Sequence, residues 1–156
     1  MNGCRFRHCR AGVSPNTGVW RYITLMKRIK MENKAKIIGI APQLVVEDVV
    51  KTAEYYRDVL GFRIIGYFLD PPVYAMVERD GFQIHFGKSD AGSVHINENI
   101  RKGIADVIIW VPEIDGFYEE LVSKNADIAE GIVQRIYGSR EFVIRDCDGH
   151  KILVGD

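Results

Sequence analysis

The residues best suited to chemistry are a histidine and an aspartate on separate predicted strands. His85 alternates with Ile84 and Phe86, so its side chain points away from the apolar layer. A histidine in this position is either a hydrogen-bonded structural group or a binding residue. Asp106 lies in the strand-like segment 104–111 and is either bonded to the backbone or paired with His85. In such a pair, each group favours the charged form of the other.

The cysteines offer little for catalysis. There are three, an odd number, which argues against a disulfide framework and favours a reducing, cytoplasmic location. Cys4, His8 and Cys9 lack a second ligand pair at a useful distance, so we expect an incidental cluster rather than a zinc site. Cys147 lies beside two aspartates, which disfavour its thiolate and make it a poor nucleophile. The sequence contains neither a recognisable nucleophile set nor a glycine-rich phosphate loop.

Charge is divided unevenly along a chain whose formal net charge is zero. Residues 1–36 contain nine Lys/Arg and one acid, so residues 37–156 contain 12 basic and 20 acidic side chains, a net charge of −8. The basic segment is either a nucleic-acid contact or a non-native N-terminal extension; Met31, just before the first predicted strand, favours the second interpretation. The acidic remainder makes nucleic acid an unsuitable main partner and suits a cationic small molecule. We expect neither a signal peptide nor a membrane span, because no apolar run approaches the ~20 residues that a span needs.

The hydrophobic pattern predicts the same order of elements twice. In the first half, strand 37–46 is followed by a helix capped by Asp48 and ended by Gly61, and then by strands 62–69, 73–79 and 82–86. Asp80-Gly81 is typical of a two-residue hairpin turn. The second half repeats strand, helix, strand, strand, strand, through segments 104–111, 113–125, 128–137, 141–144 and 152–154. A repeat of about 65 residues is too long for a solenoid and indicates two fused, equivalent modules.

Two motifs resemble the vicinal oxygen chelate superfamily, which includes glyoxalase I, extradiol dioxygenases and bleomycin resistance proteins. They are residues 46–62 (VEDVVKTAEYYRDVLGF) and residues 137–149 (YGSREFVIRDCDG). The second is most similar to the bleomycin-resistance branch, although Cys147 replaces the usual proline and Ser139 is inserted. The resemblance implies an α+β fold of two βαβββ modules, 37–88 and 104–156, joined by a linker, 89–103. The modules would form a curved, cup-shaped mixed sheet with helices on its outer face.

The resemblance also implies where a metal would bind. The four ligand positions of metal-using members fall on Ala41, His85, Asp106 and Leu153, and the first and last of these have no donor atom. Gln43 offers a substitute donor if the register shifts. We therefore expect no metal, no other cofactor and no catalytic residue. The alternative is a metal-dependent lyase, isomerase or dioxygenase that uses His85 and Asp106 with an unrecognised third ligand.

These features predict a small-molecule binding protein that sequesters a planar, cationic or aromatic ligand and so confers antibiotic resistance without turnover. Trp110 shares the face of Asp106, and Tyr137 falls where the bleomycin-resistance branch carries an aromatic residue. The expected ligand-binding residues are Gln43, Tyr67, Tyr74, His85, Asp106, Trp110, Tyr137 and Phe142. The family also implies a homodimer, with the cup completed by a second subunit. A third alternative is a cup filled by its own side chains.

Overall fold

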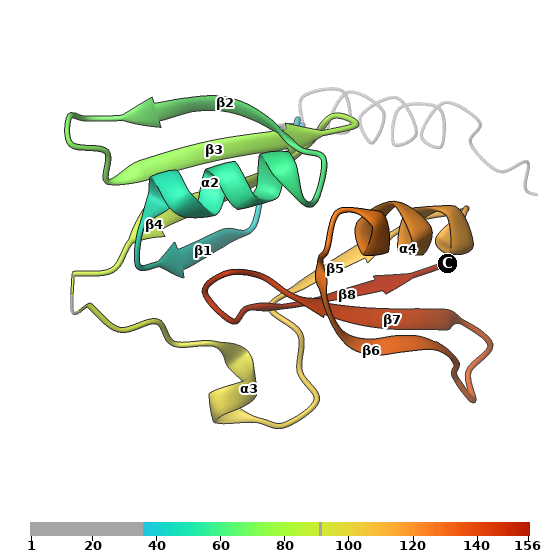
Figure 1. Cartoon of the computed structure of the whole chain (residues 1–156). Coiled ribbons are helices and arrows are strands. Elements are labelled where there is room, and N and C mark those ends of the chain that lie inside the picture. Colours follow the sequence, from blue (N-terminus) through green and yellow to red (C-terminus); the bar gives the residue numbers. More distant parts are fainter. Residues whose placement is uncertain (1–35, 91) are drawn as a thin grey trace, which may run out of the picture. The chain divides into compact units, whose positions relative to one another are not determined.

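The computed structural model describes residues 36–90 and 92–156, and Gly39–Asp156 forms one compact unit. The Cys4–Cys9 cluster and all of the basic segment except Lys36 therefore lie outside the described residues. Within them the elements are β1 (Gln43–Val46), α2 (Val49–Asp58), β2 (Arg63–Phe68), β3 (Tyr74–Arg79), β4 (Phe82–Lys88), α3 (Asn97–Ile100), β5 (Val107–Trp110), α4 (Ile114–Ser123), β6 (Asp127–Gln134), β7 (Arg140–Arg145) and β8 (Lys151–Gly155) (Figure 1). None of these helices has the length and apolar character needed to cross a bilayer.

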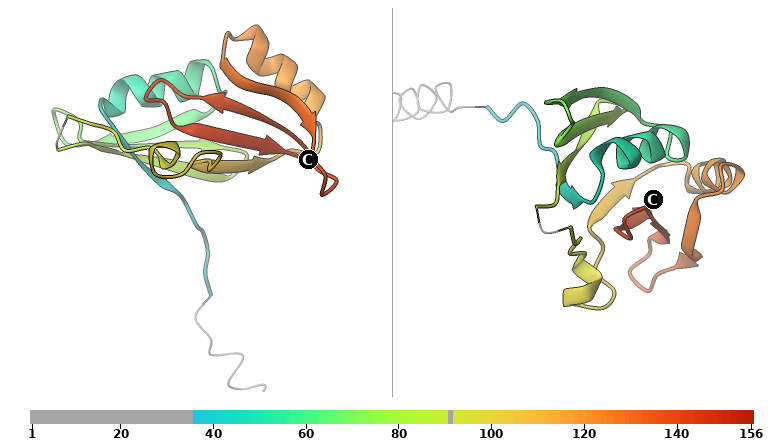
Figure 2. Two further views of the ribbon diagram at one scale, coloured as in Figure 1. Left: turned by 90° about the horizontal axis from the view of Figure 1, so that it is seen from below. Right: turned by 60° about the vertical axis from the view of Figure 1, so that its left-hand side comes forward.

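The eight described strands form two four-stranded sheets with the same topology. The orders are β1-β4-β3-β2 and β5-β8-β7-β6. In each sheet the first pair is parallel and the others are antiparallel. Figure 2 shows α2 on one face of the first sheet and α4 on one face of the second. The α+β fold of repeated βαβββ units is confirmed, with the strands hydrogen-bonded as two mixed sheets.

Local signals begin and end α2, and a local signal also ends α4. The Asp48 carboxylate accepts hydrogen bonds from the Val50 and Lys51 N–H groups at 2.9 and 3.2 Å, which satisfies donors of the first turn of α2. Gly61 follows this helix with φ 73°, and Asn125 follows α4 with φ 59°. Both conformations are left-handed, and glycine and asparagine adopt them most readily.

Each helix covers the apolar side chains of its own sheet. The first helix packs Tyr56 against Phe86, with ring centroids 4.8 Å apart, and both residues are fully buried. The second helix packs Tyr118 against Phe142 with centroids 5.1 Å apart. Because side chains alternate along a strand, the opposite face of each sheet carries the residues between the core positions and has no helix of its own repeat.

The structure differs from the predicted elements at several places; the strand expected from residue 104, for example, begins at Val107. The first strand begins at Gln43 rather than at residue 37, consistent with the missing N–H of Pro42. A four-residue helix, α3, lies within the segment 89–103 that we expected to be a linker. The sixth strand ends at Gln134 because the chain turns at Gly138, where the Arg135 N–H donates to the Ser139 carbonyl at 2.8 Å.

Hydrogen bonds join the two repeats at the turn between β7 and β8. The Tyr56 hydroxyl donates to Asp146 at 3.1 Å, and the Thr52 hydroxyl donates to Asp148 at 2.5 Å. The His150 Nε2 lies 2.9 Å from the Val45 carbonyl and donates to it. This turn is therefore a polar seam between the repeats, and the hydrogen-bonded residues are 90 to 105 positions apart in sequence.

Candidate functional site

The helix-free face of the first sheet carries His85 in a hydrogen-bonded group. Gln43 lies directly across from His85 in the strand pairing, and Tyr74 lies on the neighbouring strand. The Tyr74 hydroxyl is 2.6 Å from His85 Nδ1, and His85 Nε2 is 3.0 Å from Gln83 Oε1. Because the amide oxygen only accepts, Nε2 carries the proton and Nδ1 accepts from the phenol. Both imidazole nitrogens are therefore occupied by neighbouring side chains.

The helix-free face of the second sheet carries an exposed indole. Trp110, Gly155 and Glu141 form one row across three neighbouring strands. Trp110 is 63% exposed, and a Cβ atom on Gly155 would lie only 2.7 Å from Cζ3 of the indole. The ring therefore lies over the backbone of Gly155, in space that only glycine leaves open.

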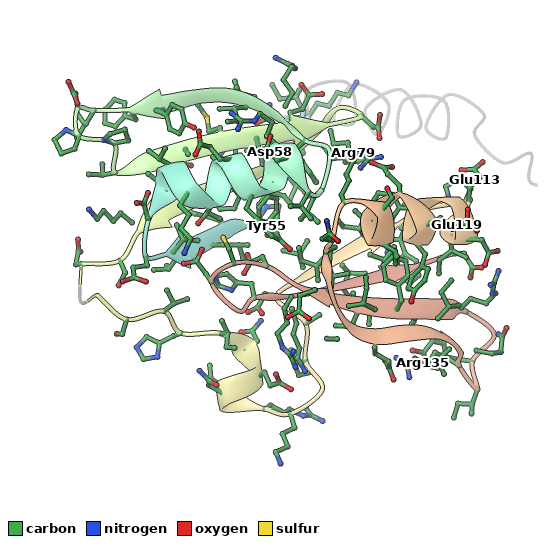
Figure 3. All side chains as sticks on the ribbon, viewed as in Figure 1. Tyr55, Asp58, Arg79, Glu113, Glu119 and Arg135 are labelled. Carbon is green, nitrogen blue, oxygen red and sulfur yellow. The ribbon has the colours of Figure 1, made fainter. Side chains whose placement is uncertain are left out.

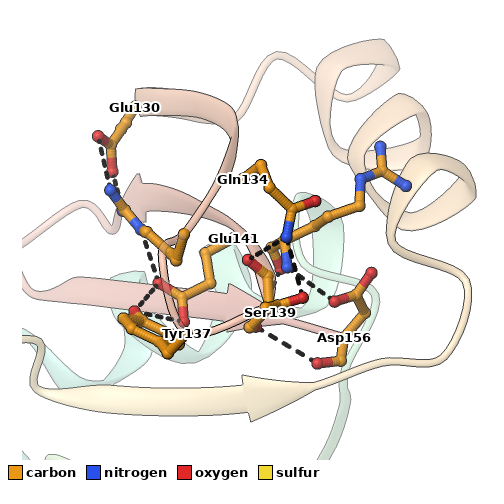
Figure 4. Close-up of polar contacts among 9 residues, drawn as sticks. Glu130, Gln134, Tyr137, Ser139, Glu141 and Asp156 are labelled. Atoms are coloured by element: carbon orange, nitrogen blue, oxygen red, sulfur yellow. Dashed lines mark hydrogen bonds and ion pairs between the residues drawn. The ribbon is translucent and has the colours of Figure 1, made fainter.

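Beside this indole lies a buried carboxylate with a ring anchored to it. Glu141 is 3% exposed; it accepts a hydrogen bond from Arg135 Nε at 2.9 Å, and both of its oxygens lie 2.9 Å from the Tyr137 hydroxyl (Figure 4). Arg135 also forms an ion pair with Glu130. The hydrogen bonds to Glu130 and Glu141 raise the pKa of Arg135, and the hydrogen bond to Glu141 raises the pKa of Tyr137. The four side chains carry a net charge of −1.

This arrangement has the properties of a recognition surface. Tyr137 is 69% exposed although its hydroxyl is anchored, so its ring is held in place at the surface. Trp110 presents a second exposed aromatic ring in the same cross-strand row as Glu141. Exposed aromatic faces next to net negative charge attract flat cations. Sequence reasoning included both rings but missed Glu141 and Arg135 as part of the site.

Two predicted site residues lie on the other side of their sheets. Phe142 is fully buried beneath α4, so it packs the core instead of lining the helix-free face. Tyr67 pairs with Ala75, which is buried beneath α2. Burial and the nearby Glu54 raise the pKa of Tyr67, consistent with this location. The sequence did not fix the facing of these two residues, and the structure places both on the helix-covered faces.

Asp106 has a structural environment. Its carboxylate accepts hydrogen bonds from the backbone N–H groups of Asn97 and Lys151, each at 2.9 Å, and its side chain is 6% exposed. Its Oδ1 lies 3.6 Å from Nδ1 of the buried His150. Asp106 thus ties α3 to β8, and the pairing with His85 that we considered does not occur.

The four positions implied by the family do not form a metal-binding set. Ala41 and Leu153 provide no donor atom. His85 and Asp106 lie in different repeats, and each already forms the hydrogen bonds described above. Within residues 36–90 and 92–156, no group of three or more His, Cys, Asp or Glu side chains is placed to hold a metal ion. Gln43, the substitute donor considered above, lies across from His85 in the strand pairing.

A pocket of about 650 Å³ lies where the β3–β4 turn meets β5 and α4. Its walls include Phe62, Phe82, Phe117 and Trp110. Arg79 and Glu113, both labelled in Figure 3, contribute charged groups to its lining. Of the eight predicted site residues, Trp110 alone lines this pocket.

Cys147 is unsuited to nucleophilic chemistry, as predicted. Burial, with the negative charge of Asp148 as a second cause, raises the pKa of its thiol to about 12. A thiol with this pKa is almost wholly protonated at neutral pH.

A family model described as "Glyoxalase/Bleomycin resistance protein/Dioxygenase superfamily" matches residues 37–154. No curated protein sequence matches the chain.

Three solved structures illustrate the likeness of fold. TioX from Micromonospora sp. ML1 is 20% identical, with a TM-score of 0.61 over 75% of this chain and 96% of its own. A glyoxalase-related enzyme from Clostridium phytofermentans is 16% identical, with a TM-score of 0.63 over 79% and 97%. The bleomycin-binding protein of Streptomyces verticillus, solved with copper(II)-bleomycin, is 22% identical, with a TM-score of 0.59 over 78% and 97%. At these identities the likeness establishes the fold alone.

Proposed function

Because the chain belongs to the glyoxalase/bleomycin resistance protein/dioxygenase superfamily, we propose that it is a small-molecule binding protein that sequesters a planar, positively charged organic ligand without a catalytic metal. The observation that carries the proposal is the position of Trp110. Its exposed indole lies over Gly155, in the same cross-strand row as the buried carboxylate of Glu141. A flat ligand stacks on such a ring through its π face, and a positive charge is attracted by the net charge beside it.

Two further observations support a cationic ligand. Residues 37–156 carry a net charge of −8, which raises the local concentration of cations around the protein. The bleomycin-binding protein of Streptomyces verticillus has a similar fold and binds a drug-sized organic molecule. Sequestration of a toxic compound in the cytoplasm, giving antibiotic resistance, is the physiological role that we propose.

The proposal includes a homodimer. The helix-free faces carry several apolar side chains that are exposed in one chain; Val45, Phe68, Ile108 and Trp110 are each between 46% and 63% exposed. Contiguous exposed apolar surface of this kind marks interaction sites. A second copy that covered part of these faces would also enclose a ligand stacked on Trp110. Sedimentation-velocity ultracentrifugation of the full chain tests this, and a monomer at all concentrations would contradict it.

Isothermal titration calorimetry tests the ligand. Metal-free bleomycin and ethidium are suitable planar cations, and we expect saturable heats with the wild-type chain. Trp110→Ala should weaken binding about tenfold or more, because stacking on one aromatic ring contributes ~1–2 kcal/mol. Tyr67→Ala is the matched control, since Tyr67 is an exposed aromatic residue on the α2 side of its sheet. Absence of heats with every planar cation, or equal affinity for the two variants, would reject the proposal.

A further inference from the structure

The pocket between the two repeats has an apolar floor and aromatic walls. Three buried core residues, Phe62, Ile84 and Val107, reach its floor. Phe82 and Phe117 contribute aromatic rings, and Phe82 is 76% exposed. A volume of about 650 Å³ is within the range of roughly 300–1,000 Å³ that is usual for small-molecule sites. Core side chains are thus accessible here to a ligand of moderate size.

The pocket exists because equivalent turns of the two repeats pack differently. In the second repeat, the turn between β7 and β8 is joined to the first repeat by the hydrogen bonds of Asp146, Asp148 and His150 described above. In the first repeat, the turn between β3 and β4 is joined to the second repeat through Arg79. This guanidinium lies 2.8 Å from Glu120 on α4 and 4.8 Å from the centroid of the Phe117 ring. Arg79, Glu120 and Phe117 all line the pocket, and the Phe82 side chain in the same lining is exposed.

The charges around the pocket favour a cation. The charged residues of its lining are Arg79, Asp80, Glu113 and Glu120, which sum to −2. Arg79 is already engaged by Glu120 at 2.8 Å and lies 3.6 Å from Asp80. The N-terminus of α4 adds a partial positive charge of about +0.5, too small to reverse the sign. The Arg79 guanidinium over Phe117 also indicates that the π face of this ring is oriented toward positive charge.

We propose that this pocket is a second binding site, distinct from the surface around Tyr137 and Glu141, and that it takes a compact hydrophobic cation. The ligand would place an alicyclic or aromatic body against Phe82 and Ile84 and an ammonium group near Asp80 and Glu113. A compact body suits a hollow walled on several sides, whereas a flat one suits the single exposed face of Trp110. Trp110 lies at the boundary of the two sites.

The test uses three probes of nearly equal shape with the full chain in low-salt buffer. They are 1-adamantylammonium, 1-adamantanol and adamantane-1-carboxylate, none of which stacks flat on an indole. Calorimetry should show the tightest binding for the ammonium, weaker binding for the alcohol and the weakest for the carboxylate. The ammonium should bind at least about tenfold more tightly than the carboxylate, because the charged residues of the pocket lining sum to −2 and repel an anion. Asp80→Asn combined with Glu113→Gln should reduce this preference to about threefold or less. Asparagine also tolerates the φ of 54° at residue 80.

A matched pair of phenylalanine variants locates the site. Phe82→Ala should weaken the ammonium probe about tenfold, and Phe68→Ala, 61% exposed on the helix-free face of the first sheet, should leave it unchanged. Both side chains are mostly exposed, so thermal unfolding should confirm that both variants fold. Equal affinity for the three probes, no binding, or an effect of Phe68→Ala without one of Phe82→Ala would overturn the proposal. So would conversion of a dimer to a monomer by Phe82→Ala, which would identify the pocket as a subunit contact. The proposed ethidium site uses Trp110 and not Phe82. If the adamantyl probes do not bind the pocket, the planar-ligand site can therefore still be tested separately.

Discussion

The indole of Trp110 lies directly over Gly155, on the neighbouring parallel strand. A Cβ atom at residue 155 would lie 2.7 Å from Cζ3 and 3.0 Å from Cε3 of the ring. Real Cβ atoms essentially never approach as closely as 2.7 Å, and 3.0 Å is tighter than most Cβ contacts, so a side chain at residue 155 must displace the indole. The orientation of the proposed stacking surface therefore depends on a residue that has no side chain.

Gly155→Ala should weaken ligand binding while lowering the stability of the fold only slightly. The indole is 63% exposed and free to move outward, so we expect the free energy of unfolding to fall by no more than about 1–2 kcal/mol. The affinity for ethidium should fall about tenfold, because the ring is displaced from its position over Gly155. Urea unfolding and calorimetry measure the two effects. Gly131→Ala is a suitable control, since a Cβ atom there would meet its nearest neighbour at 3.7 Å. An ethidium affinity unchanged by Gly155→Ala would contradict the proposed stacking geometry.

Glu141→Ala should destabilise the protein, because Glu141 is a buried, hydrogen-bonded carboxylate. The buried carboxylate accepts hydrogen bonds from Arg135 and Tyr137, and its removal leaves these donors without their partner. Loss of a charged hydrogen-bond partner in a buried position costs about 1–3 kcal/mol. Tyr137→Phe removes only the hydroxyl contact and should leave stability closer to wild type while increasing the mobility of the ring. Urea unfolding of both variants, with ¹⁹F NMR of fluorotyrosine-labelled protein, would separate the two effects. If Glu141→Ala were as stable as wild type, the carboxylate would not organise this surface.

The sequence predicted the elements better than it predicted the faces of the strands. Asp48, Gly61 and the Asp80-Gly81 turn act through local backbone chemistry; residues 80 and 81 have φ values of 54° and 85°, as a tight hairpin turn requires. The sequence did not determine which face of the sheet Phe142 occupies. Residues 142–144 are all apolar, and a shift of one residue in the strand register moves every side chain to the opposite face.

The burial of Glu141 and the pocket depend on contacts between distant segments. Glu141 is buried because the segment that follows β6 folds back to bring Arg135 and Tyr137 onto it. The pocket depends on how the β3–β4 turn meets an element about thirty to forty residues away. No pattern within a single strand or helix contains this information, so these features were found only in three dimensions.

Asp146 should make the seam between the repeats sensitive to pH. Burial raises the pKa of this carboxyl above its usual value, although hydrogen bonds from Tyr56, Asp148 and His150 oppose the shift. A raised pKa in the folded state means that this group contributes stability below its unfolded pKa, near 4. That contribution is lost as the pH rises through the folded pKa. Asp146→Asn does not titrate, so its stability relative to wild type should increase from pH 4 to pH 7.

Urea unfolding at several pH values measures this difference. Asp146→Ala should be destabilised by about 1–3 kcal/mol throughout, since it leaves buried donors unpaired. Asp127→Asn, at an exposed carboxylate on β6, provides the control for a change of charge alone. The interpretation fails if the stability of Asp146→Asn relative to wild type decreases as the pH rises.

The Cys147 thiol should react very slowly with alkylating agents in the folded protein. With the other two cysteines replaced, as Cys4→Ser and Cys9→Ser, its thiol is the only one in the chain. A pKa of about 12 leaves a thiolate fraction at pH 8.5 that is roughly a thousand times smaller than that of an ordinary cysteine. Iodoacetamide should therefore label the folded variant on the order of a thousandfold more slowly than the same variant in urea. A difference of less than about tenfold would mean that the thiolate is stabilised in the fold, and a nucleophilic role for Cys147 would then have to be reconsidered alongside ligand binding.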